Sequence, residues 1–204
     1  MTPILSILIP TYNRADMTIE CIKSVGIHDD VEIVVVDDDS NEYEYQKLLG
    51  WGLDNIWKGC LRRNIENLGM VKNINRCMSL ATGQWFGLIG SDDWYKPDAI
   101  THVLELLQKI PPALVVYSRS VEMRVSQPGH DTAAMLRQPS GSGNFWHRSI
   151  YEDLGGFDER LTIGGDPEYW PRIVTKYPLY EWPERFCVVR EHADNLMWTV
   201  WREP

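Results

Sequence analysis

Residues 84–97 read QWFGLIGSDDWYKP and carry the strongest structural signal in the chain. The apolar, aromatic residues 84–89 are typical of a buried strand, and Pro97 is suited to the first turn of a helix. The neighbouring carboxylates of Asp92 and Asp93 therefore stand where a core strand ends. In open α/β sheets, ligands bind at that edge.

Two like charges held close together raise each other's pKa unless a positive charge lies beside them. Mg²⁺ and Mn²⁺ favour carboxylate oxygens together with substrate phosphates, so a divalent cation carrying a phosphorylated ligand is the simplest neutraliser of Asp92 and Asp93. The alternative is a solvated turn in which an aspartate caps the next helix.

The size and composition of the chain exclude several classes of protein. Its 204 residues fit one domain, or one domain with a short appendage, and a hydrophobic fraction of 44% with nine Trp can fill a sizeable core. The net charge is −9 and no run of Lys or Arg is present. This balance argues against nucleic acid or an anionic membrane surface as the main partner.

Cysteine usage and the N-terminus favour a cytoplasmic protein. Cys21, Cys60, Cys77 and Cys187 are scattered without a Cys-x-x-Cys, which predicts free thiols in a reducing compartment. The N-terminus lacks the basic region of a signal peptide, and no apolar run approaches the roughly 20 residues of a spanning helix. We therefore expect no transmembrane segment.

Strand and helix signals alternate through the first half. We expect strands over residues 4–9, 32–36, 56–61, 84–89 and 113–117, and helices over about 15–25, 43–49, 70–81 and 97–110. This order predicts βαβ units and a mostly parallel sheet.

The second half is less regular. Residues 121–143 are polar and contain Pro128-Gly129 and Gly141-Ser142-Gly143, which indicates a loop or lid. Helices are expected over 148–154 and 167–176, and short strands over 179–182 and 186–190.

Acidic side chains occur at three predicted strand edges or helix starts: residues 37–39, Asp92-Asp93 and Asp166. No Gly-x-Gly-x-x-Gly follows the first strand, which argues against a nicotinamide or flavin enzyme. Asp166 precedes Pro167, so it is expected either to cap a helix or to aim a carboxylate at a substrate. Together the three sites are what a metal-dependent nucleotide-sugar enzyme needs.

The order of the motifs resembles a family-2 glycosyltransferase with the GT-A fold, an α/β fold with a Rossmann-like, mostly parallel sheet flanked by helices and a less regular C-terminal acceptor half. The resemblance spans nearly the whole chain, in motifs at residues 6–14, 34–40, 67–73, 81–83, 91–93, 155–159 and 165–168. It implies a single catalytic domain over 1–204, with donor binding in 1–120 and acceptor binding in 121–204. The end of the chain at residues 202–204 suggests that this domain is cut from a longer protein.

The resemblance also implies roles for individual residues. The donor nucleotide would contact Thr11 and Tyr12 at the base, Asp38 at the base or ribose, Asp92 at the ribose, and Arg14 and Lys72 nearby. Asp93 would bind Mn²⁺ or Mg²⁺, His192 would contact the metal or a phosphate as in some relatives, and Asp166 would be the catalytic base.

These roles imply an inverting enzyme of glycan biosynthesis that moves a sugar from a UDP-, GDP- or dTDP-linked donor to a glycan or other hydroxyl acceptor. The Gln-x-x-Arg-Trp motif of processive synthases is absent, which favours transfer of a single sugar. Two residues depart from the family pattern, because Asp39 stands in place of a glycine and Gly165 in place of a glutamate.

Two other functions remain open from the sequence. A sugar-1-phosphate nucleotidyltransferase also uses metal-binding aspartates, although only Arg14 is present where it needs a basic, Gly-rich loop. The other is a non-catalytic nucleotide-sugar-binding module. Aromatic residues are weaker candidates: Trp94, Trp146 and Trp170 for stacking on sugar rings, and Trp198 and Trp201 for an interfacial helix or a domain contact.

Overall fold

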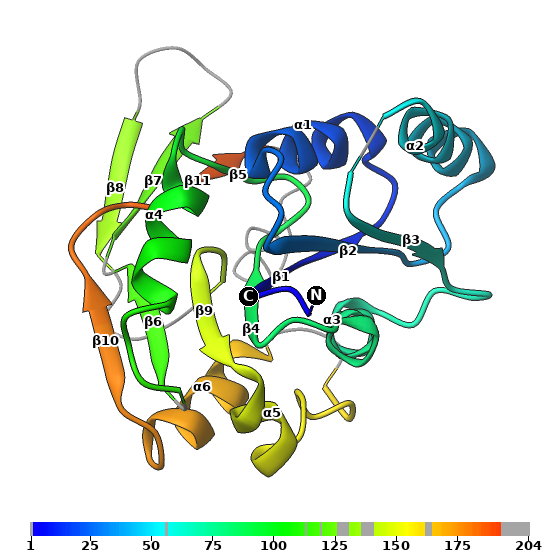
Figure 1. The fold of residues 1–204 in the computed structure, drawn as a ribbon. Helices are drawn as coiled ribbons and strands as arrows, with labels where there is room; N and C mark the ends of the chain where they lie inside the picture. The colour runs from blue at the N-terminus through cyan, green and yellow to red at the C-terminus, as the bar shows by residue number, and fades with distance from the viewer. Residues whose placement is uncertain are drawn as a thin grey trace.

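The computed structural model describes residues 2–55, 57–112, 114–118, 120–125, 131–135, 141–161 and 165–192. Over these residues the chain folds into two sheets with helices on both faces of the larger one (Figure 1). The expected α/β fold is confirmed. Trp198 and Trp201 lie outside the described residues.

The larger sheet has seven strands over the described residues, in the order β10-β6-β9-β4-β1-β2-β3. Their bounds are Leu5–Thr11 (β1), Val31–Asp37 (β2), Gly59–Arg63 (β3), Trp85–Leu88 (β4), Val115–Ser118 (β6), Asn144–His147 (β9) and Leu179–Trp182 (β10). All neighbours are parallel except β9, which runs antiparallel to both β4 and β6. The sheet is therefore mostly parallel, as predicted.

A smaller sheet has the order β5-β11-β7-β8 in the described part of the chain. Its strands are Trp94–Tyr95 (β5), Ser120–Val125 (β7), Asp131–Met135 (β8) and Cys187–Glu191 (β11). The expectation of an irregular loop over 121–143 is wrong in part, because β7 and β8 form an antiparallel pair there. Strand β5 follows Asp93 directly and pairs with β11, so this sheet lies next to the aspartate pair.

The helices are α1 (Ala15–Val25), α2 (Glu42–Asp54), α3 (Met70–Leu80), α4 (Ala99–Leu107), α5 (Arg148–Leu154) and α6 (Asp166–Val174). Pro97 does not open α4 as expected. The helix begins two residues later, after Asp98, whose backbone is left-handed with a φ of 61°. Helix α2 continues to Asp54, beyond its predicted end near residue 49.

Strand β1 shows how the larger sheet divides the core into two apolar clusters. Leu5, Ile7 and Ile9 pack in one cluster with residues of α1 and α4, whereas Leu8 packs in the other with residues of α3, α5 and α6. Successive side chains of a strand point to opposite faces, so a fully apolar strand is buried on both sides. The core thus fixes β1 in the middle of the sheet.

A buried polar cluster joins the starts of three strands. The Ser6 hydroxyl donates to Glu32 at 2.6 Å, and the Thr82 hydroxyl donates to the same carboxylate at 2.8 Å. The backbone N–H of Gly83 donates to Ser6 Oγ at 2.8 Å. A Cβ at position 83 would lie 2.5 Å from Ser6 Oγ, so this turn requires glycine.

Two further expectations concern the cysteines and the membrane. All four cysteines are free, and Cys21, Cys77 and Cys187 are buried, as predicted. Among the described helices, none combines the length and apolar character needed to cross a bilayer.

Candidate active site

The carboxyl ends of β1, β2 and β4 meet along one edge of the larger sheet. Thr11 at the end of β1 is in register with Asp37 at the end of β2, and Leu8 is in register with Leu88 of β4. The chain builds β2 and β3 on one side of β1 and then returns to place β4 on the other side. Such a reversal leaves a crevice at the carboxyl ends of the two central strands.

Asp92 joins three elements at this crevice. One of its carboxylate oxygens, Oδ2, accepts a hydrogen bond from Arg14 Nη1, and the same oxygen lies 3.0 Å from His192 Nε2. Arg14 follows β1, Asp92 follows β4 and His192 follows β11. All three side chains are at most one-quarter exposed. The structure therefore brings together these three predicted site residues.

Asp93 is only 6% exposed, and both of its carboxylate oxygens accept hydrogen bonds. Arg190 N–H donates to Oδ1 at 3.0 Å, and the Ser142 hydroxyl donates to Oδ2. Burial, and then the charge of Asp92, raise the pKa of Asp93 to about 7, although these hydrogen bonds and the charge of Arg190 act in the opposite direction. Asp93 is thus a carboxylate whose ionised form lacks sufficient local positive charge.

Asp166 is the first residue of α6 rather than the residue that caps it, which corrects the expectation of a helix cap. Its Oδ2 accepts a hydrogen bond from the Gly141 N–H at 2.7 Å, and its Oδ1 accepts one from Trp170 Nε1 at 2.9 Å. Steric packing explains why the residue before Asp166 is a glycine, Gly165. A Cβ there would lie 2.6 Å from a ring carbon of Phe157, so the family's glutamate does not fit this packing.

Ser142 lies between Asp93 and Asp166, and the sequence analysis did not identify it as a site residue. Its hydroxyl donates to Asp93 and accepts from the Gly90 N–H at 2.8 Å, while the adjacent Gly141 N–H donates to Asp166. Asp93 and Asp166 are therefore held by consecutive residues. The Gly-Ser-Gly pattern was the available signal, since Gly141 and Gly143 have φ values of 59° and 86°, which favour glycine.

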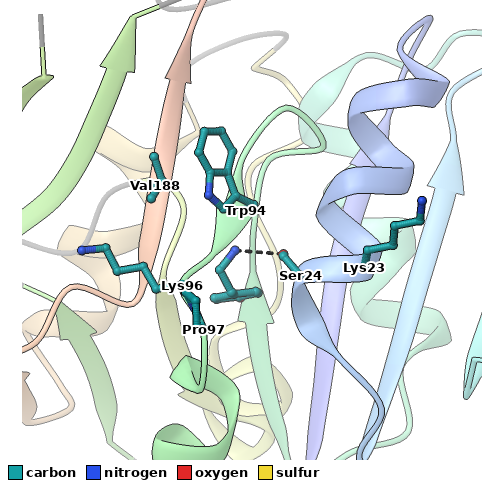
Figure 2. Close-up of a pocket in the computed structure, with 7 residues that line it drawn as sticks. Lys23, Ser24, Trp94, Lys96, Pro97 and Val188 are labelled. Carbon is teal, nitrogen blue, oxygen red and sulfur yellow. Dashed lines mark hydrogen bonds between the residues drawn. The ribbon is translucent and has the colours of Figure 1, made fainter. Parts of the chain in front are cut away.

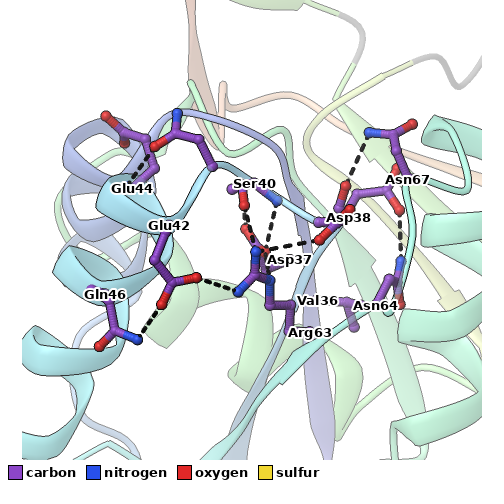
Figure 3. A network of polar contacts seen from close by, with 12 residues as sticks. Val36, Asp37, Asp38, Ser40, Glu42, Glu44, Gln46, Arg63, Asn64 and Asn67 are labelled. Atoms are coloured by element: carbon purple, nitrogen blue, oxygen red, sulfur yellow. Dashed lines mark hydrogen bonds and ion pairs between the residues drawn. The ribbon is translucent and has the colours of Figure 1, made fainter.

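Asp38 is a structural centre for a loop, as Figure 3 shows. It is 3% exposed, and its carboxylate accepts from Asn64 Nδ2 at 2.6 Å and from the N–H groups of Leu68 and Gly69 at 2.9 Å each. These bonds hold residues 64–69 against the end of β2. Contact of Asp38 with a nucleotide stays a prediction.

The other two aspartates of the first cluster are paired with Arg63, at the centre of Figure 3. Its guanidinium nitrogens lie 3.7 Å from Asp37, 3.3 Å from Asp39 and 2.9 Å from Glu42. Asp39 adopts a left-handed backbone with a φ of 62°. Glycine adopts this conformation without strain and aspartate tolerates it, so the turn is kept despite the departure from the family pattern.

The remaining donor-binding candidates differ in exposure. Thr11 is 4% exposed and its hydroxyl lies 2.7 Å from the Thr18 hydroxyl, whereas Tyr12 is 45% exposed at the same edge. Lys72 is exposed on the first turn of α3. Their roles toward a nucleotide stay predictions.

Trp146 and Trp170 are fully buried, so the prediction that their rings stack on a sugar is wrong. Trp94 is partly exposed, with the Arg190 guanidinium 4.8 Å from its ring centre. Trp94 lines a cavity of about 690 Å³ between α1, β5 and β11, shown in Figure 2 with Lys23, Ser24, Lys96, Pro97 and Val188. Asp38, Asp93 and Asp166 do not line this cavity.

The described residues suit a divalent cation only in part. Among them, no three His, Cys, Asp or Glu side chains are grouped closely enough to hold a metal alone. Mg²⁺ is usually held by one or two carboxylates, with waters and substrate phosphates completing its shell, and Mn²⁺ also suits oxygen ligands. The carboxylates of Asp92 and Asp93 are of the type that such a shell uses, and binding of a metal by Asp93 or His192 stays a prediction.

Comparison with known proteins identifies the family. The family model described as glycosyl transferase family 2 matches residues 6–162. The chain belongs to glycosyl transferase family 2 and is a glycosyltransferase by that membership.

Two curated relatives illustrate the match. The chain is 26% identical over 189 residues to a PGL/p-HBAD biosynthesis glycosyltransferase of Mycobacterium bovis, a match that covers 86% of this chain and 73% of that protein. It is 30% identical over 213 residues to an uncharacterized glycosyltransferase of Rickettsia prowazekii, covering 94% of this chain and 65% of that protein.

Solved structures confirm the GT-A fold. Staphylococcus aureus TarS 1–349 in complex with UDP-GlcNAc aligns with a TM-score of 0.78 at 16% identity, over 96% of this chain and 60% of that one. A Pyrobaculum calidifontis mannosyltransferase in complex with GDP-Man and Mn²⁺ aligns with a TM-score of 0.72 at 18% identity, over 99% of this chain and 60% of that one. The chain thus spans about three-fifths of these solved chains.

Proposed function

We propose that this chain transfers a single sugar, with inversion, from a nucleotide-diphosphate sugar to an acceptor hydroxyl, with Asp166 as general base. The observation that carries the proposal is the link from Asp93 through Ser142 and Gly141 to Asp166 at the crevice between β1 and β4. This link supports a site in which Asp93 would serve the donor and Asp166 the acceptor. Residues 1–120 would bind the donor and 121–204 the acceptor.

The donor end consists of Asp92, Asp93, Arg14 and His192. Asp93, with Asp92 and His192 beside it, would hold Mn²⁺ or Mg²⁺, which when bound supplies positive charge to the diphosphate leaving group. Arg14 is the cation of the β1 loop, and its contact with Asp92 places it at the same crevice. The complexes of the solved neighbours with UDP-GlcNAc and with GDP-Man support uridine and guanosine donors as the first candidates.

The acceptor end is Asp166. Its two oxygens accept hydrogen bonds from the Gly141 N–H and from Trp170 Nε1, and a carboxylate oxygen can accept more than one hydrogen bond, as contact with an acceptor hydroxyl would require. Asp166 would take the hydroxyl proton as the acceptor oxygen attacks the anomeric carbon, on the face opposite the departing nucleoside diphosphate. Single displacement of this kind inverts the anomeric configuration.

Asp166→Asn tests the base directly. A positioned general base contributes about 10²–10⁴-fold, so we expect at least a ~10²-fold lower turnover with donor affinity retained. Candidate donors come from a thermal-shift panel of UDP-, GDP- and dTDP-linked sugars with Mn²⁺, because a ligand that binds the native state raises apparent stability. Transfer is then followed by product formation, and the anomeric configuration by NMR.

Asp98→Asn is the matched control, because Asp98 is exposed and asparagine tolerates its left-handed backbone. Near-normal transfer by Asp166→Asn, or a product that retains the donor's configuration, would reject the mechanism. Turnover of a nucleoside triphosphate plus a sugar phosphate would instead support the nucleotidyltransferase.

A further inference from the structure

Trp170 has a specific polar contact in an otherwise apolar environment. It lies four residues after Asp166, on the same face of α6, and its Nε1 is 2.9 Å from Asp166 Oδ1. The ring is fully buried and packs edge to face against Trp146, with ring centres 5.3 Å apart. The indole N–H therefore has a fixed direction.

The second carboxylate oxygen of Asp166, Oδ2, is held by a residue that precedes it in the chain. The Gly141 N–H lies 2.7 Å from Oδ2. The terminal torsion of an aspartate is broad and two-fold, so one hydrogen bond leaves its carboxylate plane free to rotate. Two charge-assisted bonds from different elements, one to each oxygen, fix that plane.

The Gly141 end of this arrangement is itself anchored. Ser142 is 8% exposed, donates to Asp93 and accepts from the Gly90 N–H at 2.8 Å. The Gly141 carbonyl accepts from Asn144 Nδ2 at 2.9 Å, at the start of β9. The turn that holds Asp166 is thus tied to the loop that carries Asp93.

We propose that Trp170, together with the Gly141-Ser142 turn, positions the Asp166 carboxylate for proton abstraction at a fixed place relative to Asp93. Trp170 acts through Asp166 and does not touch the sugar. This inference rests on the proposed function, since it needs Asp166 to be the base.

The test is a double-mutant cycle between Trp170→Phe and Asp166→Asn. Trp170→Phe keeps an aromatic ring and removes the N–H, and loss of one such bond in the transition state is expected to lower kcat about tenfold. KM for the donor and the affinity for the nucleoside diphosphate should be unchanged. If Trp170 acts only through Asp166, the double variant should be no slower than Asp166→Asn alone.

Trp182→Phe is the matched control. The Nε1 of Trp182 is buried and makes no hydrogen bond within the described residues, and its ring packs on Phe186 in the other apolar cluster, away from Trp170. It should keep kcat within about twofold of the parent, because aromatic packing without a link to the base does not enter the proton transfer.

The outcomes distinguish failure of the proposed function from failure of the positioning role of Trp170. If Asp166→Asn transfers normally, the proposed function fails and this inference fails with it. If Asp166→Asn is impaired but the two losses multiply in the double variant, Trp170 has only a packing role and the inference alone is overturned. Should Trp170→Phe not fold, benzothienylalanine at position 170 replaces the N–H by sulfur at similar volume and repeats the test.

Discussion

Asp93→Asn is expected to make the metal-free protein more stable at alkaline pH. Asp93 is buried, and its pKa is raised from 3.8 to about 7, first by burial and then by Asp92. The unfolded chain therefore ionises this group above about pH 4, whereas the folded chain does so only above about pH 7. The unfolded state binds fewer protons across this window, so the free energy of unfolding falls as the pH rises.

The magnitude follows from the size of the shift. At 1.36 kcal/mol for each pKa unit, the interval between 3.8 and about 7 corresponds to roughly 4 kcal/mol, lost progressively between these two pH values. Asparagine carries no charge, and its oxygen can still accept from the Arg190 N–H. We expect Asp93→Asn to gain about 2–4 kcal/mol over the parent at pH 8, and to gain nothing at pH 4.

Urea unfolding at pH 4, 6 and 8, with a chelator present, measures this difference. Asp98→Asn controls for net charge, since it also removes one negative charge from a chain of net charge −9, but at an exposed position. With Mn²⁺ and a nucleoside diphosphate, the parent should gain stability and Asp93→Asn should not. An equal gain at pH 4 and pH 8, or a loss at pH 8, would refute the reasoning.

Two further substitutions test the structural contacts that hold the loop of residues 64–69 and the turn before β4. Asp38→Ala leaves the N–H groups of Leu68 and Gly69 without their acceptor. We therefore expect the free energy of unfolding in urea to fall by about 3 kcal/mol or more. A fall below about 1 kcal/mol would contradict the structural role of this carboxylate. Gly83→Ala places a Cβ 2.5 Å from Ser6 Oγ and should lose about 1–3 kcal/mol by the same measurement, whereas Gly50→Ala, with nothing within 4 Å, should not destabilise α2.

The first half of the fold was predictable because its signals are local. The apolar runs of β1, β2 and β4 are buried on both faces, so each is visible in a few consecutive residues. Strand β9 was missed, since its four residues are a strand only by pairing with β4 and β6. Strand β7 carries an alternating pattern, Val121-Glu-Met-Arg-Val125, but the polar surroundings outweighed it.

The site was predictable at the level of strand ends and not at the level of contacts. Asp92 and Asp93 could be placed at this edge because parallel strands end together, whereas Asp166 begins a helix and was assigned to the site only through the resemblance. The hydrogen-bond partners of Asp38 come from a loop about 30 residues away, and the burial of Trp170 depends on Trp146 from another element. Such long-range packing leaves no mark in the local sequence.

The charge balance of the crevice bears on how a donor would enter. A diphosphate brings negative charge to an edge that already holds Asp92 and Asp93, and like charges in a poorly solvated site repel strongly. Arg14 and His192 share a single oxygen of Asp92. Arg14 could therefore leave for a phosphate while His192 still donates a hydrogen bond to Asp92. Asp93 has no such second partner among the described cations, because its oxygens accept only from a backbone N–H and a hydroxyl. We therefore predict that Arg14 is the exchangeable cation at Asp92 and that donor binding needs an added cation at Asp93.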